Sequence, residues 1–412
     1  MKKIMFCAFL AFATYTTKAT DLVVQESGPT GTYSSISAAI TAATNGDRII
    51  INNRTGGLYW SEDININKSI QLLSNVDTVR FKYQGNVTIT PAVGREITII
   101  GMENNLGSIT AASASPAGTR TKVNIYNCLL NTGNIVFDYD YFNVNLVSNI
   151  LNIGNITIRF GKIIGNHMGN TGSSYGIIVN TDATPTNDTI LIIGNKIYSP
   201  ASYGLLLNSS SQFVLVSNNL FRVYIYGIYI PNIKGGQGVN SINNNSFYCI
   251  HTSYAYTPIR FNTSATTDCK LDILNNVAVA YTGSDYFISL SGGVFSGALN
   301  VSYNYTGSNL NGCNSTSLPN NGTNSYVNSY VGYSNGTTLQ NSTGSPAING
   351  AHPAKYYYDL DLTRGDAGCY GGSWTLNNFF PITGSSRVYM INSARSAIVG
   401  SIINIKADGF DR

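Results

Sequence analysis

Charged side chains are scarce in this sequence of 412 residues, in which Asp, Glu, Lys and Arg together make up only 11%. The formal charge is +4, and loss of the three lysines within the first 19 residues would leave +1. Binding to nucleic-acid phosphates requires a dense basic surface. The composition therefore argues against a nucleic-acid partner.

Histidine is also rare, with three residues at positions 167, 251 and 352, and the sequence contains no Cys-x-x-Cys pair. Zinc sites need His and Cys ligands at close, regular spacing. We therefore expect no metal site and no cofactor.

The chain lacks an apolar run as long as the roughly 20 residues that a membrane-spanning helix needs. The first 19 residues, MKKIMFCAFLAFATYTTKA, begin with lysines, continue with a short apolar run and end with small residues before a possible cut after Ala19. This pattern is typical of a secretory signal peptide. The sequence predicts a secreted or cell-surface monomer without a transmembrane segment.

Neutral polar and aromatic residues take the place of charge. The chain has 28 tyrosines and 41 glycines, together with many Asn, Ser and Thr residues. Such a surface suits sugars, which present apolar ring faces and hydroxyl groups, or protein partners, better than ions. We expect a polysaccharide or a surface partner.

A repeated unit runs through the middle of the chain. Residues 163–179 (IIGNHMGNTGSSYGIIV), 191–208 (LIIGNKIYSPASYGLLLN) and 214–230 (VLVSNNLFRVYIYGIYI) align on an Asn and on a Tyr-Gly pair that follows 8 or 9 residues later. The Asn positions are 29 and 23 residues apart. Recurrence at this period is typical of a solenoid, in which each coil buries its apolar side against its neighbours.

The repeated segments predict short, buried parallel strands. Apolar runs of four to six residues are bounded by Asn, Gly or Ser, as in RIIIN, SIQLL, EITII, KVNIY, NITIRF, TILII and QFVLV. Helical spacing occurs only near residues 34–44, where Ile36, Ala39, Ile40 and Ala43 share one face before Gly46. We therefore predict an all-β fold, a right-handed parallel β-helix solenoid over residues 20–372 with an N-terminal capping helix.

Both ends of the predicted solenoid resemble a known family. The stretch TYSSISAAITAATNGDRIIINN with GLYWSEDININKSIQLLS is similar to the opening of β-helix proteins of the pectin-lyase-like superfamily. The stretch GSPAINGA with DLDLTRGDAGCYGG resembles the closing coil of secreted bacterial β-helix proteins. The resemblance implies the fold but not one activity, because this superfamily contains lyases, hydrolases, esterases and proteins without known chemistry.

The catalytic motifs that the resemblance implies are incomplete. The D-x-x-x-G and L-G-R-P-W motifs of pectin methylesterases are absent, and the NTD stretch at 180–182 lacks the Asp pair and the G-H-G of polygalacturonase-like hydrolases. Lyases of this fold need an acidic calcium cluster and a Lys or Arg base. Weak catalytic candidates remain, which could equally be turn residues: Asp138, Asp140, Asp182, Asp188 and Asp268.

Aromatic residues after the Asn positions have a similar phase on successive repeats. If exposed, they would form a platform for sugar rings, and if buried, they would be core. The candidates for this substrate-binding platform are Tyr198, Tyr224, Tyr254, Tyr256 and Tyr281.

The repeated Asn is interpreted as structural. Asn tolerates the left-handed turn conformation, and stacked side-chain amides can hydrogen-bond from coil to coil. The predicted ladder consists of Asn166, Asn195, Asn218, Asn244 and Asn275.

Five cysteines follow residue 19, at 128, 249, 269, 313 and 369. Cys249 and Cys269 are 20 residues apart, close to one repeat, and could form a disulfide between adjacent coils in an oxidising compartment. The alternative is that they are isolated buried thiols.

The sequence after Gly372 loses the repeat and contains a Phe-Phe-Pro break. Alternating patterns in RVYMIN and SIINIKA predict two short antiparallel strands within the tail 373–412. The tail could fold over the last coil as a cap, which we favour, or protrude and bind a secretion or surface partner. For the whole chain we favour an exported, non-catalytic β-helix that binds polysaccharide or a surface partner; the alternative is a polysaccharide lyase or glycoside hydrolase.

Overall fold

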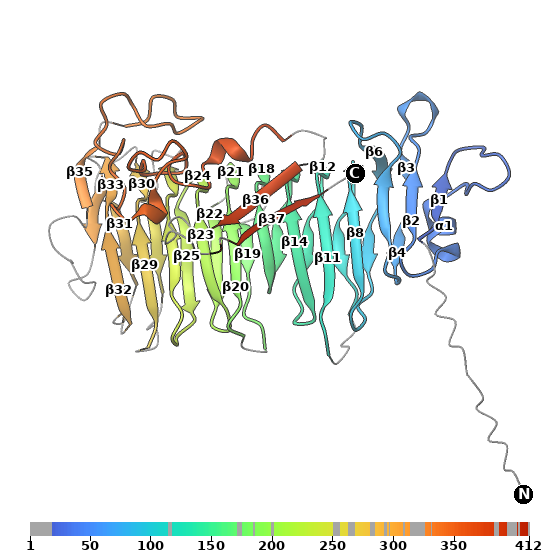
Figure 1. Ribbon diagram of the computed structural model, residues 1–412, viewed down its shortest axis with the longest axis horizontal. Helices are drawn as coiled ribbons and strands as arrows, with labels where there is room; N and C mark the ends of the chain where they lie inside the picture. Colours follow the sequence, from blue (N-terminus) through green and yellow to red (C-terminus); the bar gives the residue numbers. More distant parts are fainter. Residues whose placement is uncertain are drawn as a thin grey trace, which may run out of the picture.

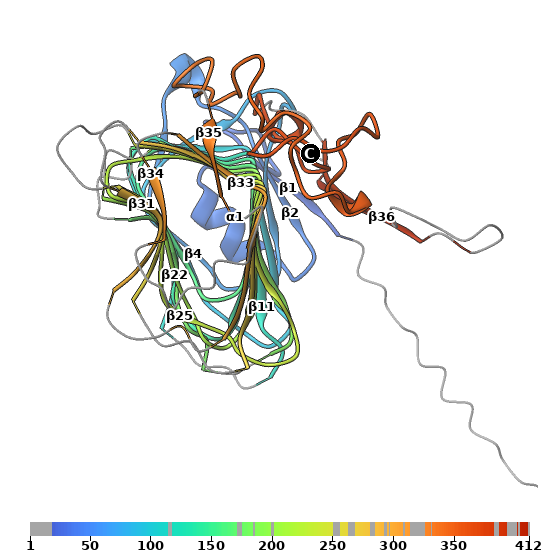
Figure 2. The same cartoon turned by 90° about the vertical axis from the view of Figure 1, so that its left-hand side faces the viewer.

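The protein is a long stack of short parallel strands (Figure 1). The computed structural model describes residues 19–410 apart from 114–117, 171–174, 184–185, 199–201, 250–255, 263–267, 281–284, 292–294, 296, 308–309, 314–325, 331, 383–386, 394–401 and 403. The predicted signal peptide lies outside the described residues, except for Ala19. Viewed along the stack, the strands form a ring (Figure 2), and buried apolar side chains fill its interior.

Three parallel sheets form the walls, and each coil contributes one strand to each sheet. Sheet A has 12 strands, β1 (Asp21–Val24), β2 (Arg48–Ile51), β5 (Gln71–Ser74), β8 (Glu96–Ile100), β11 (Thr121–Tyr126), β14 (Phe142–Val147), β17 (Gly161–Ile164), β20 (Thr189–Ile193), β23 (Phe213–Ser217), β26 (Asn240–Asn243), β29 (Lys270–Leu274) and β32 (Ala298–Ser302). Sheet B has 12, β3 (Trp60–Ser61), β6 (Phe81–Gln84), β9 (Met102–Asn104), β12 (Leu129–Leu130), β15 (Ile150–Ile153), β18 (His167–Asn170), β21 (Lys196–Tyr198), β24 (Leu220–Val223), β27 (Ser246–Cys249), β30 (Val277–Val279), β33 (Asn304–Gly307) and β35 (Tyr326–Tyr330). Sheet C has 11, β4 (Ile64–Ile66), β7 (Val87–Ile89), β10 (Ile109–Ala111), β13 (Ile135–Phe137), β16 (Ile156–Ile158), β19 (Tyr175–Val179), β22 (Tyr203–Ser209), β25 (Tyr226–Ile233), β28 (Thr257–Phe261), β31 (Asp285–Leu290) and β34 (Leu310–Cys313).

The predicted fold class is confirmed: the chain is a right-handed parallel β-helix solenoid. Inward side chains of all three sheets form one continuous apolar core. Inside this core, for example, Phe221 and Phe247 stack with ring centroids 5.0 Å apart. A Cβ atom on Gly204 would collide with Phe221, and one on Gly227 with Phe247. The glycines of the second and third Tyr-Gly pairs are therefore required by the ring stack inside.

The capping helix is also confirmed. Helix α1 (Ile36–Ala42) begins after Ser35, whose side chain accepts a hydrogen bond from the Ala38 amide. The Glu62 carboxylate accepts the Ile36 and Ser37 amides at 2.8 and 2.9 Å, which ties the start of the helix to the first coil. The predicted apolar face, which begins at Ile36, is buried over the open end of the stack (Figure 2).

The turn from sheet A to sheet B explains the repeated Asn. In the coils from residue 148 to residue 304, two adjacent residues form this turn. The first adopts a positive φ, and the second buries its amide and donates a hydrogen bond to the same amide on the next coil. The donor–acceptor distances are 2.9 to 3.0 Å from Asn149 through Asn166, Asn195, Asn219, Asn245 and Asn276 to Asn304.

The predicted ladder therefore needs a correction of one residue at three positions. Asn166 and Asn195 belong to the buried ladder, whereas Asn218, Asn244 and Asn275 precede it, with φ of 55°, 52° and 58°. Their left-handed backbone points the side chains outward. Asn218 donates to the carbonyls of residues 369 and 371, and Asn244 to that of residue 366. These amides bind the returning C-terminal segment.

The last described strand of the stack is β35, so the described solenoid ends near residue 330 rather than at the predicted residue 372. The chain then turns back along the outside, with the short 3₁₀ helices η2 (Lys355–Tyr357) and η3 (Leu376–Asn378) on the way. Two antiparallel strands follow, β36 (Arg387–Ser393) and β37 (Ile405–Phe410), in the two regions where the alternating patterns predicted them. We call residues 332–410 the return segment.

The return segment does not cap the last coil. From residue 350 onward its contacts move toward the N-terminus as the chain proceeds: Gly350 accepts a hydrogen bond from Tyr305, the Cys369 amide donates to Ser246, Phe379 lies against Gly194, and Phe410 stacks on Tyr126 at 5.1 Å. Figures 1 and 2 show the segment outside the ring of strands, along one side of the stack. The favoured cap prediction is thus replaced by a strap along the side.

An apolar row on the outside of sheet A accounts for this position. Outward residues in register on six successive coils are all apolar, and Phe379, Tyr389, Met390 and Phe410 of the return segment cover them. We call the row the lateral stripe; its members are Leu73, Ile100, Tyr126, Val147, Ile164 and Ile193. Without its cover the stripe would be an unusually long exposed apolar surface.

The described cysteines 128, 249, 269 and 369 are buried thiols, so the possible disulfide between Cys249 and Cys269 is not formed. Cys249 ends β27 in sheet B, whereas Cys269 precedes β29 in sheet A. The two lie on different walls because a coil in this region is about 30 residues long, as the 31-residue step from Asn245 to Asn276 indicates. The side chain of Cys313 lies outside the described part of the chain.

Candidate binding face and acidic cluster

Tyrosines stack on the outer face of sheet C. Tyr175, Tyr203 and Tyr226 begin three successive strands and pair in register. The Tyr175 and Tyr203 rings stack 4.7 Å apart, and Tyr203 lies 5.1 Å from Tyr226. The three half-buried rings are the tyrosines of the repeated Tyr-Gly pairs. The tyrosine by which the sequence repeats align therefore also places a ring on the outer face of each of these three coils.

Two further side chains extend this surface. Tyr229 lies 5.9 Å from both Tyr203 and Tyr226, and the Arg260 guanidinium lies over the Tyr226 ring at 5.0 Å. We call these five residues the tyrosine face. Burial raises the pKa of Tyr175 and of Tyr226, so both hydroxyls remain protonated and can donate hydrogen bonds at neutral pH.

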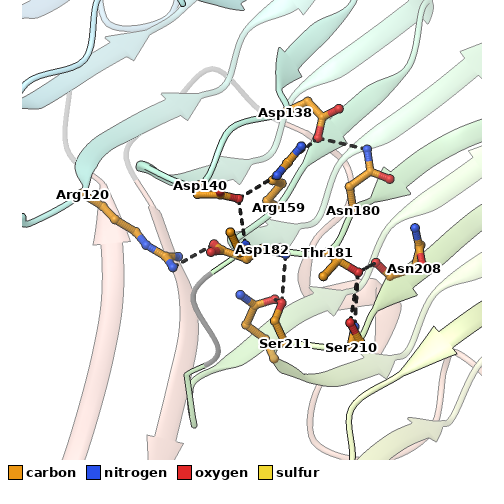
Figure 3. Close-up of polar contacts among 12 residues, drawn as sticks. Arg120, Asp138, Asp140, Arg159, Asn180, Thr181, Asp182, Asn208, Ser210 and Ser211 are labelled. Carbon is orange, nitrogen blue, oxygen red and sulfur yellow. Dashed lines mark hydrogen bonds and ion pairs between the residues drawn. The ribbon is translucent and has the colours of Figure 1, made fainter. Parts of the chain in front are cut away.

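An acidic cluster lies where neighbouring sheet C strands end (Figure 3). Arg159, just after β16, donates from Nε to Asp138 at 2.8 Å and from a terminal nitrogen to Asp140 at 2.7 Å. Asn180, just after β19, donates to Asp138 at 3.0 Å. The Ala183 amide donates to Asp140 at 3.0 Å. Three successive coils are thus joined through two carboxylates.

Asp182 lies beside this group. Its carboxylate is fully buried and 2.8 Å from Arg120, whose guanidinium also lies 4.4 Å above the Phe160 ring. The Asp182 amide donates to Ser211 on the next coil at 2.9 Å. A buried ion pair of this kind favours one turn conformation more than it favours stability.

The surroundings of Asp140 favour its ionised form. Burial acts to raise the pKa of Asp140, but the hydrogen bonds from the Ala183 amide and Arg159 outweigh it, and the pKa lies below its ordinary value. The ion pairs likewise raise the pKa of Arg159 against the effect of burial. A general acid requires a raised pKa, so Asp140 is poorly suited to donate a proton.

The structure brings together only part of the predicted catalytic set. Asp138, Asp140 and Asp182 share one region with Arg159, as Figure 3 shows. Asp188 and Asp268 are exposed and lie just before the sheet A strands β20 and β29. The grouping followed from the parallel strands, since turns after successive strands of a solenoid meet at one edge.

The predicted tyrosine platform needs correction. Tyr256 is fully buried in the core. Tyr198 is half-buried and donates its hydroxyl to the Thr337 carbonyl, so the return segment covers it. Tyr224 is partly buried and lies in the turn between β24 of sheet B and β25 of sheet C. Tyr254 and Tyr281 lie outside the described residues. The tyrosine face was missed because its residues were treated only as alignment marks.

A second group of carboxylates, not predicted from the sequence, lies in the return segment. Asp359 accepts the amides of Asp366 and Gly372. Burial, with the neighbouring Asp366 and Asp361 carboxylates, raises the pKa of Asp359 to about 6. Because it accepts hydrogen bonds from its own turn, Asp359 holds the return segment in shape.

Asp359 should make stability depend on pH. Above about pH 6 the Asp359 carboxylate is charged in the folded protein, and the burial of this charge lowers the free energy of unfolding. As the pH falls from about 6 toward 3.8, the pKa of Asp in the unfolded chain, the folded protein takes up the proton and the free energy of unfolding rises. Relative to Asp359→Asn, the wild type should gain about 1–2 kcal/mol between pH 7 and pH 4.5, after allowance for partial exposure. Urea unfolding at both pH values measures this difference. In the exposed control Asp361→Asn, the wild-type advantage should not grow toward acid, because hydrogen bonds from Thr363 lower the pKa of Asp361. A pH-independent difference for Asp359→Asn would contradict the assignment.

No family model matches this chain, and no curated protein sequence matches it. Within the described part of the chain, no helix has the length and apolar character needed to cross a bilayer. Function therefore has to be inferred from the chemistry of the surfaces themselves.

Proposed function

We propose that this protein is an exported, non-catalytic β-helix of the pectin-lyase-like type that binds a polysaccharide on the outer face of sheet C. The tyrosine face carries the proposal. Phenol rings and hydroxyls recur there on consecutive coils, close to the roughly 4.8 Å spacing of strands.

The arrangement suits an extended polymer better than a small ligand. The rings stack on one another, so their edges and hydroxyls face outward, and these groups can hydrogen-bond to sugar hydroxyls. Asn208 and Asn232 add a second polar row on the same sheet, with their amides hydrogen-bonded at 2.7 Å. A chain of similar sugar units would meet similar groups on each coil.

Export and superfamily membership rest on the sequence. The first 19 residues have the pattern of a signal peptide. The helix motif that resembles the superfamily forms α1, and the Glu of the following turn binds its N-terminus. A tyrosine-rich, nearly uncharged protein is well suited to polysaccharide outside the cell.

Polysaccharide cleavage is the second candidate, and one observation favours it. Asp138, Asp140 and Asp182 meet Arg159 in one region, and paired carboxylates can act as acid and base in glycoside hydrolysis. Against it, both Asp138 and Asp140 are ion-paired to one arginine, and the pKa of Asp140 is lowered. Binding without cleavage remains the better-supported function.

Binding is tested with the mature protein on immobilised polysaccharides and glycan arrays. The double variant Tyr203→Ala/Tyr226→Ala should weaken binding by about five- to 150-fold, because each of the two aromatic contacts contributes roughly 0.5–1.5 kcal/mol. Tyr59→Ala is the matched control, since Tyr59 precedes β3 in sheet B and contacts Glu103. Failure of the wild type to bind any polysaccharide would refute the proposal.

Cleavage is tested on the polysaccharides that bind. Release of new reducing ends or unsaturated products by the wild type, abolished by Asp138→Asn/Asp140→Asn, would establish the enzyme alternative. Binding without product, unchanged in the carboxylate variant, agrees with the proposal.

A further inference from the structure

A pocket lies on the opposite side from the tyrosine face, between sheet A and the return segment. Its base is formed by polar side chains at the sheet A to sheet B turn, including Ser217 and Asn243. Its walls are Tyr356, Tyr357 and Trp374 of the return segment. The pocket exists only because the return segment lies along the stack.

The aromatic walls are arranged at right angles. The Trp374 ring lies 6.2 Å from Tyr356 at an interplanar angle of 89°, and Tyr356 lies 5.1 Å from Tyr357, also at 89°. Edge-to-face contacts of this kind are favourable for aromatic rings and hold the three rings in place relative to one another. Ile391 of β36 stands at the rim and is 59% exposed.

The base of the pocket interrupts the lateral stripe. Ile193, in the stripe, pairs with Ser217, which pairs with Asn243, and the row becomes apolar again at Leu274. Ser217 donates within the base to Asn243 at 2.6 Å. Ser217 and Asn243 thus replace apolar residues of this row beneath the aromatic walls, and beyond Leu274 the row continues with Ser302.

The size fits one small ring. The void between the atoms of the pocket, part of it open to solvent, measures about 480 Å³. This space exceeds what one water needs several-fold and lies in the lower part of the range of ligand pockets. No residue lining it carries a charge.

We propose that this pocket binds a single neutral sugar ring, separately from the polysaccharide site on sheet C. The ring face would lie against Trp374 or Tyr356, while hydroxyls reach the Ser and Asn groups at the base. An acidic sugar would lose the hydration of its charge without an ionic partner. The pocket is therefore selective for uncharged sugars.

Trp374 supplies a direct probe, because the chain contains only two tryptophans and Trp60 is buried elsewhere. In a Trp60→Phe background, emission from Trp374 is titrated with glucose, galactose, mannose and N-acetylglucosamine. We expect a saturable change for at least one sugar, with a Kd on the order of 1–10 mM, as for a ligand of this size. Glucuronate and the open-chain polyol sorbitol should give no saturable change.

A matched pair of variants locates the binding. Ile391→Phe places a ring at the rim and should weaken binding at least about tenfold, whereas Ile405→Phe, at an exposed position on β37 outside the pocket, should leave it unchanged. Tyr203→Ala should also leave it unchanged, which separates this pocket from the proposed polysaccharide site. Absence of saturation with every neutral sugar, or equal weakening by both Phe variants, would overturn the proposal.

Discussion

Asn219→Ala should destabilise the protein by about 3–5 kcal/mol, because it leaves several buried polar groups without partners. The fully buried Asn219 side chain accepts the Asn195 amide at 3.0 Å and the Asn195 side-chain amide at 2.9 Å. It donates to the Ile192 carbonyl at 2.8 Å and to Asn245 at 3.0 Å. Truncation removes both functions in the interior, where water cannot replace them.

Asn208→Ala provides the control. Asn208 also accepts an amide from the next coil, from Asn232 at 2.7 Å, but on the outer face of sheet C. Water can replace that bond, so the cost should stay below about 1 kcal/mol. Urea unfolding followed by circular dichroism measures both variants, and hydrogen exchange shows whether opening begins around the coils of residues 193–245, as nearest-neighbour coupling in a solenoid requires. Equal stability of the two variants would contradict the ladder's role.

Asn219→Asp tests the same bond network through charge. One carboxylate oxygen can still accept the hydrogen bond from Asn195. The N–H groups that bound the Ile192 carbonyl and the Asn245 side-chain oxygen are lost, so the second carboxylate oxygen faces these two oxygens instead. The buried charge should raise the pKa of the new carboxyl. The variant should therefore be least stable at neutral pH and recover part of its stability in acid.

The ladder shows how far the repeat could be read from the sequence. At 165–166 and 194–195 the turn is Gly-Asn, and the sequence identified the ladder residue correctly, because Gly takes the positive φ and leaves the Asn to stack. At 218–219, 244–245 and 275–276 the turn is Asn-Asn. Either residue can adopt a left-handed turn or stack its amide, so the choice depends on which side faces the core.

The binding face was harder to predict for a related reason. Periodicity placed the tyrosines in phase but did not tell inside from outside, and Tyr256 and Tyr226 illustrate the two outcomes. The distinction depends on strand register and on the Phe stack behind Gly204 and Gly227. For the acidic cluster, the sequence named the aspartates as weak candidates but did not predict that Asp138, Asp140 and Asp182 meet; the alignment of turns on parallel coils explains why they do.

The return segment could not be placed from sequence. Its two strands were predicted from their alternation, but their docking site is formed by residues that are hundreds of positions away, as in the ion pair between Lys162 and Asp408 at 3.0 Å. The lateral stripe is also hidden in the sequence, since strands buried on both faces read as continuous apolar runs.

Deletion of residues 378–412 should produce a protein that aggregates and is cleaved rapidly by proteases. Phe379 and Phe410, both almost fully buried, cover the lateral stripe, and their removal exposes apolar residues on six coils. The Phe379 ring lies over Gly194, where a Cβ would collide with it, so the fit is specific. Phe379→Ala alone should cost about 3 kcal/mol.

The site of the damage distinguishes a strap from an end cap. Limited proteolysis should first cut coils between residues 96 and 193, under the lost segment, and not the last described coil at residues 298–330. Replacing Val147, Ile164 and Ile193 by Thr in the truncated protein keeps the β-branched shape and makes the stripe polar, so solubility should return. Light scattering and size-exclusion chromatography measure both effects. A truncated protein that stays soluble, monomeric and equally resistant would instead identify the segment as an element for export or attachment.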